Sequence, residues 1–331
     1  MDAEALCPSD LGLILSYRCQ CRCAHCIYNC GPDWRDWIAE HEITLALRSA
    51  LNFGSPFQVH ITGGEPFLRF DLLKRAVQVA ARLGIPVYVE TNAAWCVNER
   101  LTEQRFSELY REGLQAVLIS CSPFHAAHVP LKRTLLAMRV ASEVFGATRV
   151  MVYLPEWLKM ISTFSIDRPV SLEEYTRTYG RAETAALFWR RYGLISGGRS
   201  GYRLGDLVAG HPPQYFSSAV CRYEILYAPH SHFDLYGNFI PGFCGGLSVG
   251  NWHDLPTLKD NFLAGRYSTL IRTLIEEGPY GLYCLACSQY GYAAREEGYV
   301  GKCHLCVDVR RHLVEKGDFD ELKPAEFYDH I

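Results

Sequence analysis

A regular alternation of short apolar runs with longer amphipathic segments is the feature of this 331-residue sequence that most constrains its fold. The apolar runs, each of strand length, lie at about 12–17, 57–62, 86–91, 115–120 and 149–154. The amphipathic segments, which have helical spacing of their apolar residues, lie at about 42–53, 70–84, 99–112 and 130–146. Strands that alternate with single helices form parallel βαβ units, and five such strands predict a full or partial α/β barrel.

The alternation stops at Pro155, and two further regions follow. Residues 155–220 are too irregular for a regular βα unit and predict helices and loops. Residues 232–243 contain two apolar runs around Gly237, which predicts a hairpin. We therefore predict a barrel domain over 8–220, with an irregular insertion at 155–220, and a cysteine-rich domain over 221–331.

The cysteines are gathered at the two ends of the sequence. Of fourteen, six lie in the first 30 residues and six lie between 221 and 306, so that Cys96 and Cys121 are alone in the middle. Buried free cysteines behave as small hydrophobic residues and have no reason to gather in this way. Because thiols stay reduced inside cells, disulfides explain the pattern poorly. Two metal centres, one at each end, explain it better.

Charge and hydropathy exclude several classes of protein. The chain has 33 basic and 36 acidic residues, and a net charge of −3 gives no reason to expect nucleic acid or an anionic membrane as a partner. The N-terminal segment 1–10 is acidic, unlike a secretory or transit peptide, and no apolar stretch approaches the roughly 18–20 residues of a membrane span. We expect a soluble, cytoplasmic protein.

The first cysteine group has the spacing C-x3-C-x2-C, formed by Cys19, Cys23 and Cys26 directly after the first predicted strand. Three thiolates on a tight loop can ligate three irons of a [4Fe–4S] cluster and leave the fourth iron open to a small molecule. A zinc loop completed by a ligand from elsewhere also fits the spacing, and so does incidental crowding with Cys21 and Cys30.

Polar motifs follow the next strands of the predicted barrel. The second strand ends in Gly63, Gly64 and Glu65, followed by a proline. Paired glycines let a ligand approach the backbone. The carboxylate can accept hydrogen bonds from an ammonium group. Asn92 ends the third strand and Ser120 ends the fourth. Barrel enzymes build their active sites at the carboxyl ends of the strands, so these motifs and the cysteine loop predict one site.

This order of motifs resembles the radical S-adenosylmethionine (SAM) family over roughly residues 8–155. The resemblance implies a partial (β/α)6 radical SAM barrel in which Cys19, Cys23 and Cys26 hold a [4Fe–4S] cluster, whose free iron chelates SAM and whose reduction cleaves it to a carbon radical. It also implies that SAM contacts five residues: Gly63, Gly64 and Glu65 at the methionyl amine, and Asn92 and Ser120 near the carboxylate and ribose. His25 replaces the usual aromatic residue before the third cysteine, and the adenine contacts remain unassigned.

His125 lies just after the fourth predicted strand, at the expected mouth of the barrel. A histidine there can transfer a proton or bind substrate, because its ordinary pKa lies near neutrality. We predict a catalytic role for it, with simple solvation or hydrogen bonding as the alternative.

The second cysteine group contains Cys221 and Cys244 around the predicted hairpin, followed by two C-x2-C pairs. The two pairs alone have zinc-ribbon spacing, whereas the hairpin resembles the auxiliary iron–sulfur extension (SPASM or twitch type) that follows many radical SAM barrels. We predict an auxiliary [4Fe–4S] cluster, with structural zinc as the alternative. The best candidate ligands are Cys244, Cys284, Cys287, Cys303 and Cys306.

The resemblance predicts a radical SAM enzyme that acts on a small-molecule or natural-product substrate and takes electrons from a donor such as flavodoxin or ferredoxin. The segment before the cysteine loop is too short for a cobalamin-binding domain or a peptide-binding winged helix. A peptide maturase that receives its peptide from a partner protein is one alternative. A non-enzymatic zinc protein, which uses both cysteine groups structurally, is the other.

Overall fold

The computed structural model describes residues 5–53 and 57–331, so the first four residues of the acidic N-terminal segment lie outside it. One seven-stranded sheet organises the protein, and its strands follow the order β5-β4-β3-β2-β1-β6-β7. The strands are β1 (Asp10–Ile14), β2 (Gln58–Thr62), β3 (Val87–Thr91), β4 (Ala116–Ile119), β5 (Val150–Val152), β6 (His230–Phe233) and β7 (Phe239–Ile240). Strands β1 to β6 are parallel, and β7 returns antiparallel to β6.

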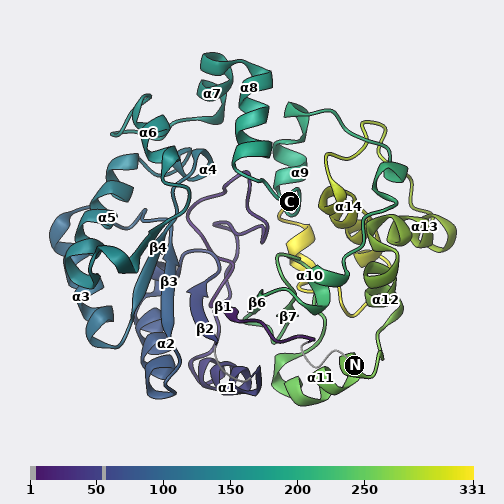
Figure 1. Cartoon of the computed structure of the whole chain (residues 1–331), viewed down its shortest axis with the longest axis horizontal. Helices are drawn as coiled ribbons and strands as arrows, with labels where there is room; N and C mark the ends of the chain where they lie inside the picture. The colour runs from purple at the N-terminus through teal and green to yellow at the C-terminus, as the bar shows by residue number, and fades with distance from the viewer. Residues whose placement is uncertain (1–4, 54–56) are drawn as a thin grey trace.

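The first helices cover the outside of this sheet, as Figure 1 shows. They are α1 (Glu40–Ala50), α2 (Phe70–Arg82), α3 (Glu99–Arg111), the short α4 (Pro123–Ala126) and α5 (Leu131–Phe145). Each of the longer helices buries an apolar stripe; in α2, for example, Leu73, Ala76 and Val77 are fully buried. The βαβ units predicted from the sequence are therefore confirmed, and the helices begin and end within about three residues of their predicted bounds.

The segment between β5 and β6 is mostly helical and lies beyond the carboxyl ends of the strands (Figure 1). It contains α6 (Glu156–Ser162), α7 (Leu172–Tyr179), α8 (Arg181–Ala185), a π-helical turn (Ala186–Arg191), α9 (Ser200–Arg203) and α10 (Arg222–Leu226). Short 3₁₀ turns lie at Leu51–Phe53, Pro66–Arg69, Ala147–Arg149, Gly205–Leu207, Pro213–Phe216, Trp252–Asp254 and Ala325–Tyr328. The mixture of helices and loops predicted for 155–220 is thus confirmed.

The C-terminal third consists of the hairpin β6–β7 and four helices, α11 (Leu255–Leu263), α12 (Thr269–Glu276), α13 (Gly278–Tyr290) and α14 (Lys302–Val314). The hairpin turn is held by Asp234, whose buried carboxylate accepts hydrogen bonds from the backbone N–H groups of Tyr236 and Asn238. The same carboxylate accepts the hydroxyl of Tyr17, at 2.8 Å, so the turn is tied to the segment that enters the cysteine loop.

The sheet continues across residue 220, because β6 pairs directly with β1. The hairpin is confirmed as an element, but its first strand belongs to the same sheet as the barrel strands. The division of the chain into domains at 220 and 221 stays a prediction. Because β1 and β6 are neighbours, residues near the N-terminus and residues after 220 face the interior of the same sheet.

Candidate active site

The cysteine loop leaves β1 through Tyr17 and folds back on itself. Two backbone hydrogen bonds close it, from Cys19 N–H to the Gly31 carbonyl (3.0 Å) and from Gly31 N–H to the Tyr17 carbonyl (3.1 Å). Within the loop, the thiols of Cys19, Cys21 and Cys23 hydrogen-bond in series. Hydrogen bonding from Cys30 lowers the pKa of the buried Cys26 thiol to about 6. Five thiols therefore crowd one loop, and three of them form the predicted motif.

The paired glycines after β2 hold this loop at close range. Gly64 N–H donates to the carbonyl of Ser16 (2.8 Å), and Glu65 N–H donates to the carbonyl of Arg18 (3.0 Å). A Cβ at Gly63 would overlap the Ser16 carbonyl, and a Cβ at Gly64 would overlap that of Arg18. Both glycines also line the cavity described below. Their first structural role is to admit the backbone of the cysteine loop.

Glu65 lies behind the cavity wall instead of lining it. Its carboxylate is fully buried and accepts three hydrogen bonds, from the backbone N–H groups of Phe67 (3.2 Å) and Asn92 (2.8 Å) and from the Thr91 hydroxyl (2.9 Å). Burial raises its pKa to about 7 even though these three donors act in the opposite direction. Glu65 therefore joins the turn after β2 to the end of β3.

Asn92 and Ser120 lie at the ends of β3 and β4, as predicted, and both are buried and line the cavity. The Asn92 side-chain amide donates to the sulfur of Cys19 at 3.4 Å, and its carbonyl oxygen accepts from Gln20 at 2.9 Å. The end of the third strand is thus in direct contact with the first cysteine of the motif.

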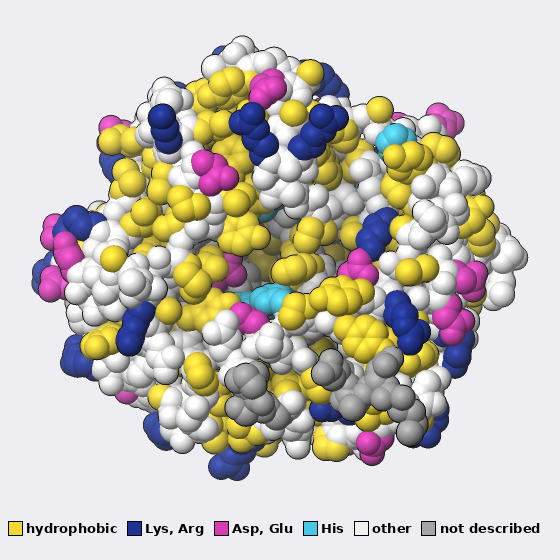
Figure 2. Space-filling model, in the orientation of Figure 1, with side chains coloured by type: hydrophobic (Ala, Val, Ile, Leu, Met, Phe, Trp, Pro, Cys, Tyr) yellow, Lys and Arg dark blue, Asp and Glu magenta, His cyan; other side chains and the backbone are white. Residues whose placement is uncertain are grey.

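A cavity of about 470 Å³ lies inside the strands, at their carboxyl ends. Figure 2 shows the hollow in this face, rimmed by hydrophobic side chains and with histidine and acidic groups inside it. Eight of the nine residues predicted for SAM, the first cluster and catalysis line it: Cys19, Cys23, Cys26, Gly63, Gly64, Asn92, Ser120 and His125. These come from the ends of four successive strands, so the fold brings the separate sequence motifs to one place.

His125 lies in the short helix α4 at the cavity wall. The hydroxyl of Ser122 accepts from its backbone N–H and also lies 2.8 Å from its Nδ1. Burial, together with a smaller effect of nearby His128, lowers the pKa of His125 to about 4. The ring of His25 packs edge-on against it, with centroids 4.8 Å apart. The imidazole is therefore neutral near pH 7 and can accept or pass on a proton.

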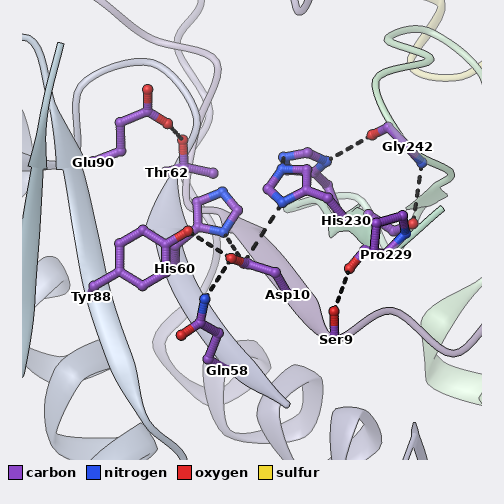
Figure 3. A network of polar contacts seen from close by, with 12 residues as sticks. Ser9, Asp10, Gln58, His60, Thr62, Tyr88, Glu90, Pro229, His230 and Gly242 are labelled. Atoms are coloured by element: carbon purple, nitrogen blue, oxygen red, sulfur yellow. Dashed lines mark hydrogen bonds and ion pairs between the residues drawn. The ribbon is translucent and has the colours of Figure 1, made fainter. Parts of the chain in front are cut away.

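Three more histidines line the cavity, His60 on β2 and His230 and His232 on β6, and Asp10 of β1 lies beside His60 (Figure 3). Asp10 accepts hydrogen bonds from His60 Nδ1, the Tyr88 hydroxyl and the Gln58 amide, each at 2.8 Å. Burial alone would raise the pKa of Asp10, but these donors lower it to about 2. Nothing in the sequence connects His60 of β2 with the histidines of β6.

Arg199 is a site residue whose role the sequence did not reveal. It is fully buried, and its guanidinium donates to the carbonyls of Cys23 (2.9 Å), Cys30 (2.6 Å) and His330 (3.1 Å). Its backbone N–H donates to the Cys26 carbonyl at 3.0 Å. Arg199, which comes from the insertion, therefore holds the cysteine loop through its carbonyl groups and places a positive charge beside it.

The C-terminal cysteines divide into two sets. Burial raises the pKa of Cys221, and three neighbouring thiols raise it further: Cys306, Cys244 and Cys303. Burial and then Cys303 raise the pKa of Cys244 to about 12, again with Cys306 contributing. Cys284 and Cys287 instead hydrogen-bond to tyrosines of their own helix, Tyr280 and Tyr283. Cys221, which the predicted ligand set omitted, therefore lies within electrostatic range of Cys244, Cys303 and Cys306.

No protein-family model matches the sequence. The chain is 28% identical over 123 residues to a GTP 3′,8-cyclase of Rhodococcus opacus (strain B4), covering 36% of this chain and 33% of that protein. It is 22% identical over 120 residues to the putative peptide biosynthesis protein YydG of Bacillus subtilis (strain 168), covering 35% and 36%. The chain therefore spans about a third of the length of these curated relatives.

Two solved structures are similar to this chain over most of its length. Native anSMEcpe with bound AdoMet matches with a TM-score of 0.46 and 13% identity, over 98% of this chain and 98% of that one. BtrN in complex with AdoMet and 2-DOIA matches with a TM-score of 0.44 and 14% identity, over 82% and 89%. Both of these solved structures hold bound AdoMet, in line with the radical SAM resemblance drawn from the cysteine motif. Among the described residues, no helix is long and apolar enough to cross a membrane.

Proposed function

We propose that this protein is a radical SAM enzyme whose cysteine loop holds a [4Fe–4S] cluster through Cys19, Cys23 and Cys26. The observation that carries the proposal is the convergence of these thiols with Gly63, Gly64, Asn92, Ser120 and His125 on one cavity. Thiolates are the ligands that iron–sulfur clusters require, and three of them leave one iron open. When bound, the cluster supplies the electron that cleaves SAM to a carbon radical.

The residues around the loop have separate parts in this proposal. Asn92 donates to the Cys19 sulfur, which stabilises negative charge on that ligand. Arg199 places a buried cation beneath the loop and holds three of its carbonyl groups. Gly63 and Gly64 line the cavity, and the amino acid part of SAM would lie beside them. Glu65, turned away from the cavity, orients Asn92 through its backbone N–H.

His125 is our candidate for a group that moves a proton during the reaction. It lines the cavity, it is neutral near pH 7, and Ser122 holds its Nδ1. These properties suit an imidazole that exchanges a proton with a substrate through Nε2.

We propose further that Cys221, Cys244, Cys303 and Cys306 hold an auxiliary iron–sulfur cluster. Four thiols within electrostatic reach of one another support this ligand set better than the two C-x2-C pairs. Arg310 lies beside them, fully buried, with a guanidinium hydrogen bond to Cys306 among its contacts. Structural zinc at the same four thiols is the alternative.

The substrate in this proposal is a small molecule or a natural product. A cavity of about 470 Å³ falls in the range of small-molecule sites, about 300–1,000 Å³. The relatives act on small molecules and on peptides, so a peptide presented by a partner protein is the second candidate.

Reductive cleavage of SAM tests the proposal. Anaerobically reconstituted protein, reduced chemically in the presence of SAM, is expected to release SAM fragments that mass spectrometry detects. Cys23→Ala should abolish this release, whereas Cys21→Ala, a change in the same loop outside the motif, should retain it. Equal loss in both variants, or a colourless wild-type protein that holds zinc at its cysteines and no iron, would contradict the proposal.

A further inference from the structure

The three histidines on the cavity wall are placed by strand register. In the parallel pairs that flank β1, Gly12 lies opposite His60 of β2 and opposite His232 of β6. Alternate residues of a strand face the same side, so His230 and Asp10 share the interior face with them. A Cβ at Gly12 would overlap the His232 ring and approach His60. Glycine at this position therefore allows imidazoles from two strands to meet over the strand between them.

The imidazoles converge closely enough to share one ion. One ring nitrogen from each of His60, His230 and His232 lies within 4.8 Å of the other two. The Nε2 atoms of His230 and His232 are 3.1 Å apart. Two nitrogens bound tetrahedrally to zinc at 2.0–2.1 Å would be separated by about 3.3 Å. Small rotations of the rings would therefore complete a three-nitrogen site.

The opposite edge of each ring faces an oxygen. His60 Nδ1 lies 2.8 Å from Asp10 Oδ1, and His230 Nδ1 lies 3.7 Å from the same oxygen, as Figure 3 shows. His232 Nδ1 lies 3.2 Å from the carbonyl of Gly242. At His60 and His232, an oxygen acceptor within hydrogen-bond distance of Nδ1 favours the tautomer that leaves Nε2 as the ligand, which is the usual arrangement around histidine-bound metals.

We propose that His60, His230 and His232 bind a divalent transition-metal ion of the kind that prefers imidazole, such as Zn²⁺ or Fe²⁺, with Asp10 orienting two of the rings. The three histidines supply no thiolate, so this site is chemically distinct from both cysteine groups.

All three histidines line the cavity that the cysteine loop also lines, so a fourth ligand would reach the metal from that cavity. Three protein ligands with an open position are typical of catalytic rather than structural metal sites. An oxygen or nitrogen of the substrate would fill that position. This anchoring role rests on the proposed function, whereas metal binding itself does not.

Zinc loading of the full iron-containing protein tests the site. After exposure to excess Zn²⁺ and desalting, the wild-type protein is expected to retain about one zinc per chain. X-ray absorption at the zinc edge should show nitrogen or oxygen neighbours at about 2.0–2.1 Å and no sulfur at about 2.3 Å. A protein that retains no zinc, or one whose zinc has sulfur neighbours, would overturn the proposal.

Variants locate the site. His230→Ala removes the least buried of the three ligands and should weaken zinc binding at least 100-fold with iron content unchanged. His253→Ala removes an exposed histidine elsewhere and should change neither metal. Asp10→Asn keeps every ligand and should weaken zinc binding about 10- to 100-fold, which decides the matter if His230→Ala does not fold. Zinc affinity equal to wild type in both folded variants would overturn the assignment.

The two proposals can fail independently. A protein that cleaves SAM but binds no zinc at nitrogen ligands would refute the histidine site alone. A protein that binds zinc there but does not cleave SAM would refute only the proposed function.

Discussion

Replacing Arg199 by methionine tests whether the insertion holds the cysteine loop. The change keeps the length of the aliphatic stem but removes the guanidinium that donates to the carbonyls of Cys23, Cys30 and His330. A hydrogen bond from a charged donor contributes about 1.5–3 kcal/mol, so three of them contribute at most about 9 kcal/mol. The desolvation cost of a buried cation without a carboxylate partner offsets several kcal/mol of this. We therefore expect a net loss of about 2–4 kcal/mol.

Thermal unfolding of the anaerobic iron-containing protein measures this loss. A free-energy change of 1 kcal/mol moves the melting temperature by about 2–4 °C in somewhat smaller proteins, so we expect a fall of roughly 3–10 °C. A chelator should also remove iron from the variant faster. Arg168→Met is the matched control, because Arg168 is exposed and pairs with Glu174; its effect should stay below about 1 kcal/mol. Should Arg199→Met melt with the wild type and keep its iron at the same rate, the guanidinium does not hold the loop.

Three further predictions concern the turn after β2 and the C-terminal thiols. Gly64→Ala should lower the stability of the protein and the amount of iron it holds, because the new Cβ overlaps the Arg18 carbonyl. Gly205→Ala is the control, since its Cβ meets only an ordinary contact with Val300. Equal melting temperatures of the two variants would contradict this. Because the pKa of Glu65 is about 7 in the folded protein and 4.5 ordinarily, its protonated form favours folding, and wild-type stability should fall by up to about 3 kcal/mol as pH rises from 4.5 through 7. Glu65→Gln should flatten this fall in denaturation curves recorded between pH 5 and 8, and parallel curves would refute the assignment. Cys303→Ala/Cys306→Ala should lose the auxiliary metal while Cys284→Ala/Cys287→Ala retains it by elemental analysis; the reverse result would restore the two C-x2-C pairs as ligands.

Much of the fold could be predicted because its local signals agree with its long-range contacts. The apolar run around Val59 and Ile61 became β2, and the stripe through Leu73, Ala76 and Val77 became the buried face of α2. Strand β1 begins two residues earlier than predicted, since Asp10 pairs with β2 and β6 although it is charged. The interior contacts of Asp10 explain why a polar residue starts this strand.

The candidate site was predictable where ligands follow one another in the chain, and less so where they meet through folding. Gly63, Gly64 and Asn92 are on the cavity as expected because parallel strands end at one edge of the sheet. Glu65 turned inward, since its carboxylate accepts two hydrogen bonds from the end of β3 and one from the backbone of its own turn. The electrostatic proximity of Cys221 to Cys306 depends on helix packing that no spacing reveals.

The alternation in HSHF, with His230 and His232 two residues apart, was the available sign that both face one side of a strand. It could be connected to His60 only once β6 was known to lie beside β1.

The position of β1 between β2 and β6 has a consequence for how the protein is made. Gly12 pairs with His60 soon after synthesis, but its other partner, His232, is 220 residues further along the chain. At about 5–20 residues per second, a ribosome needs roughly 10–45 s to reach it. For that time β1 is an edge strand with unpaired backbone groups, next to a loop of reduced thiols. We expect nascent chains to need chaperones, and to need iron delivery to wait, during this interval. We also expect chains truncated before β6 to aggregate.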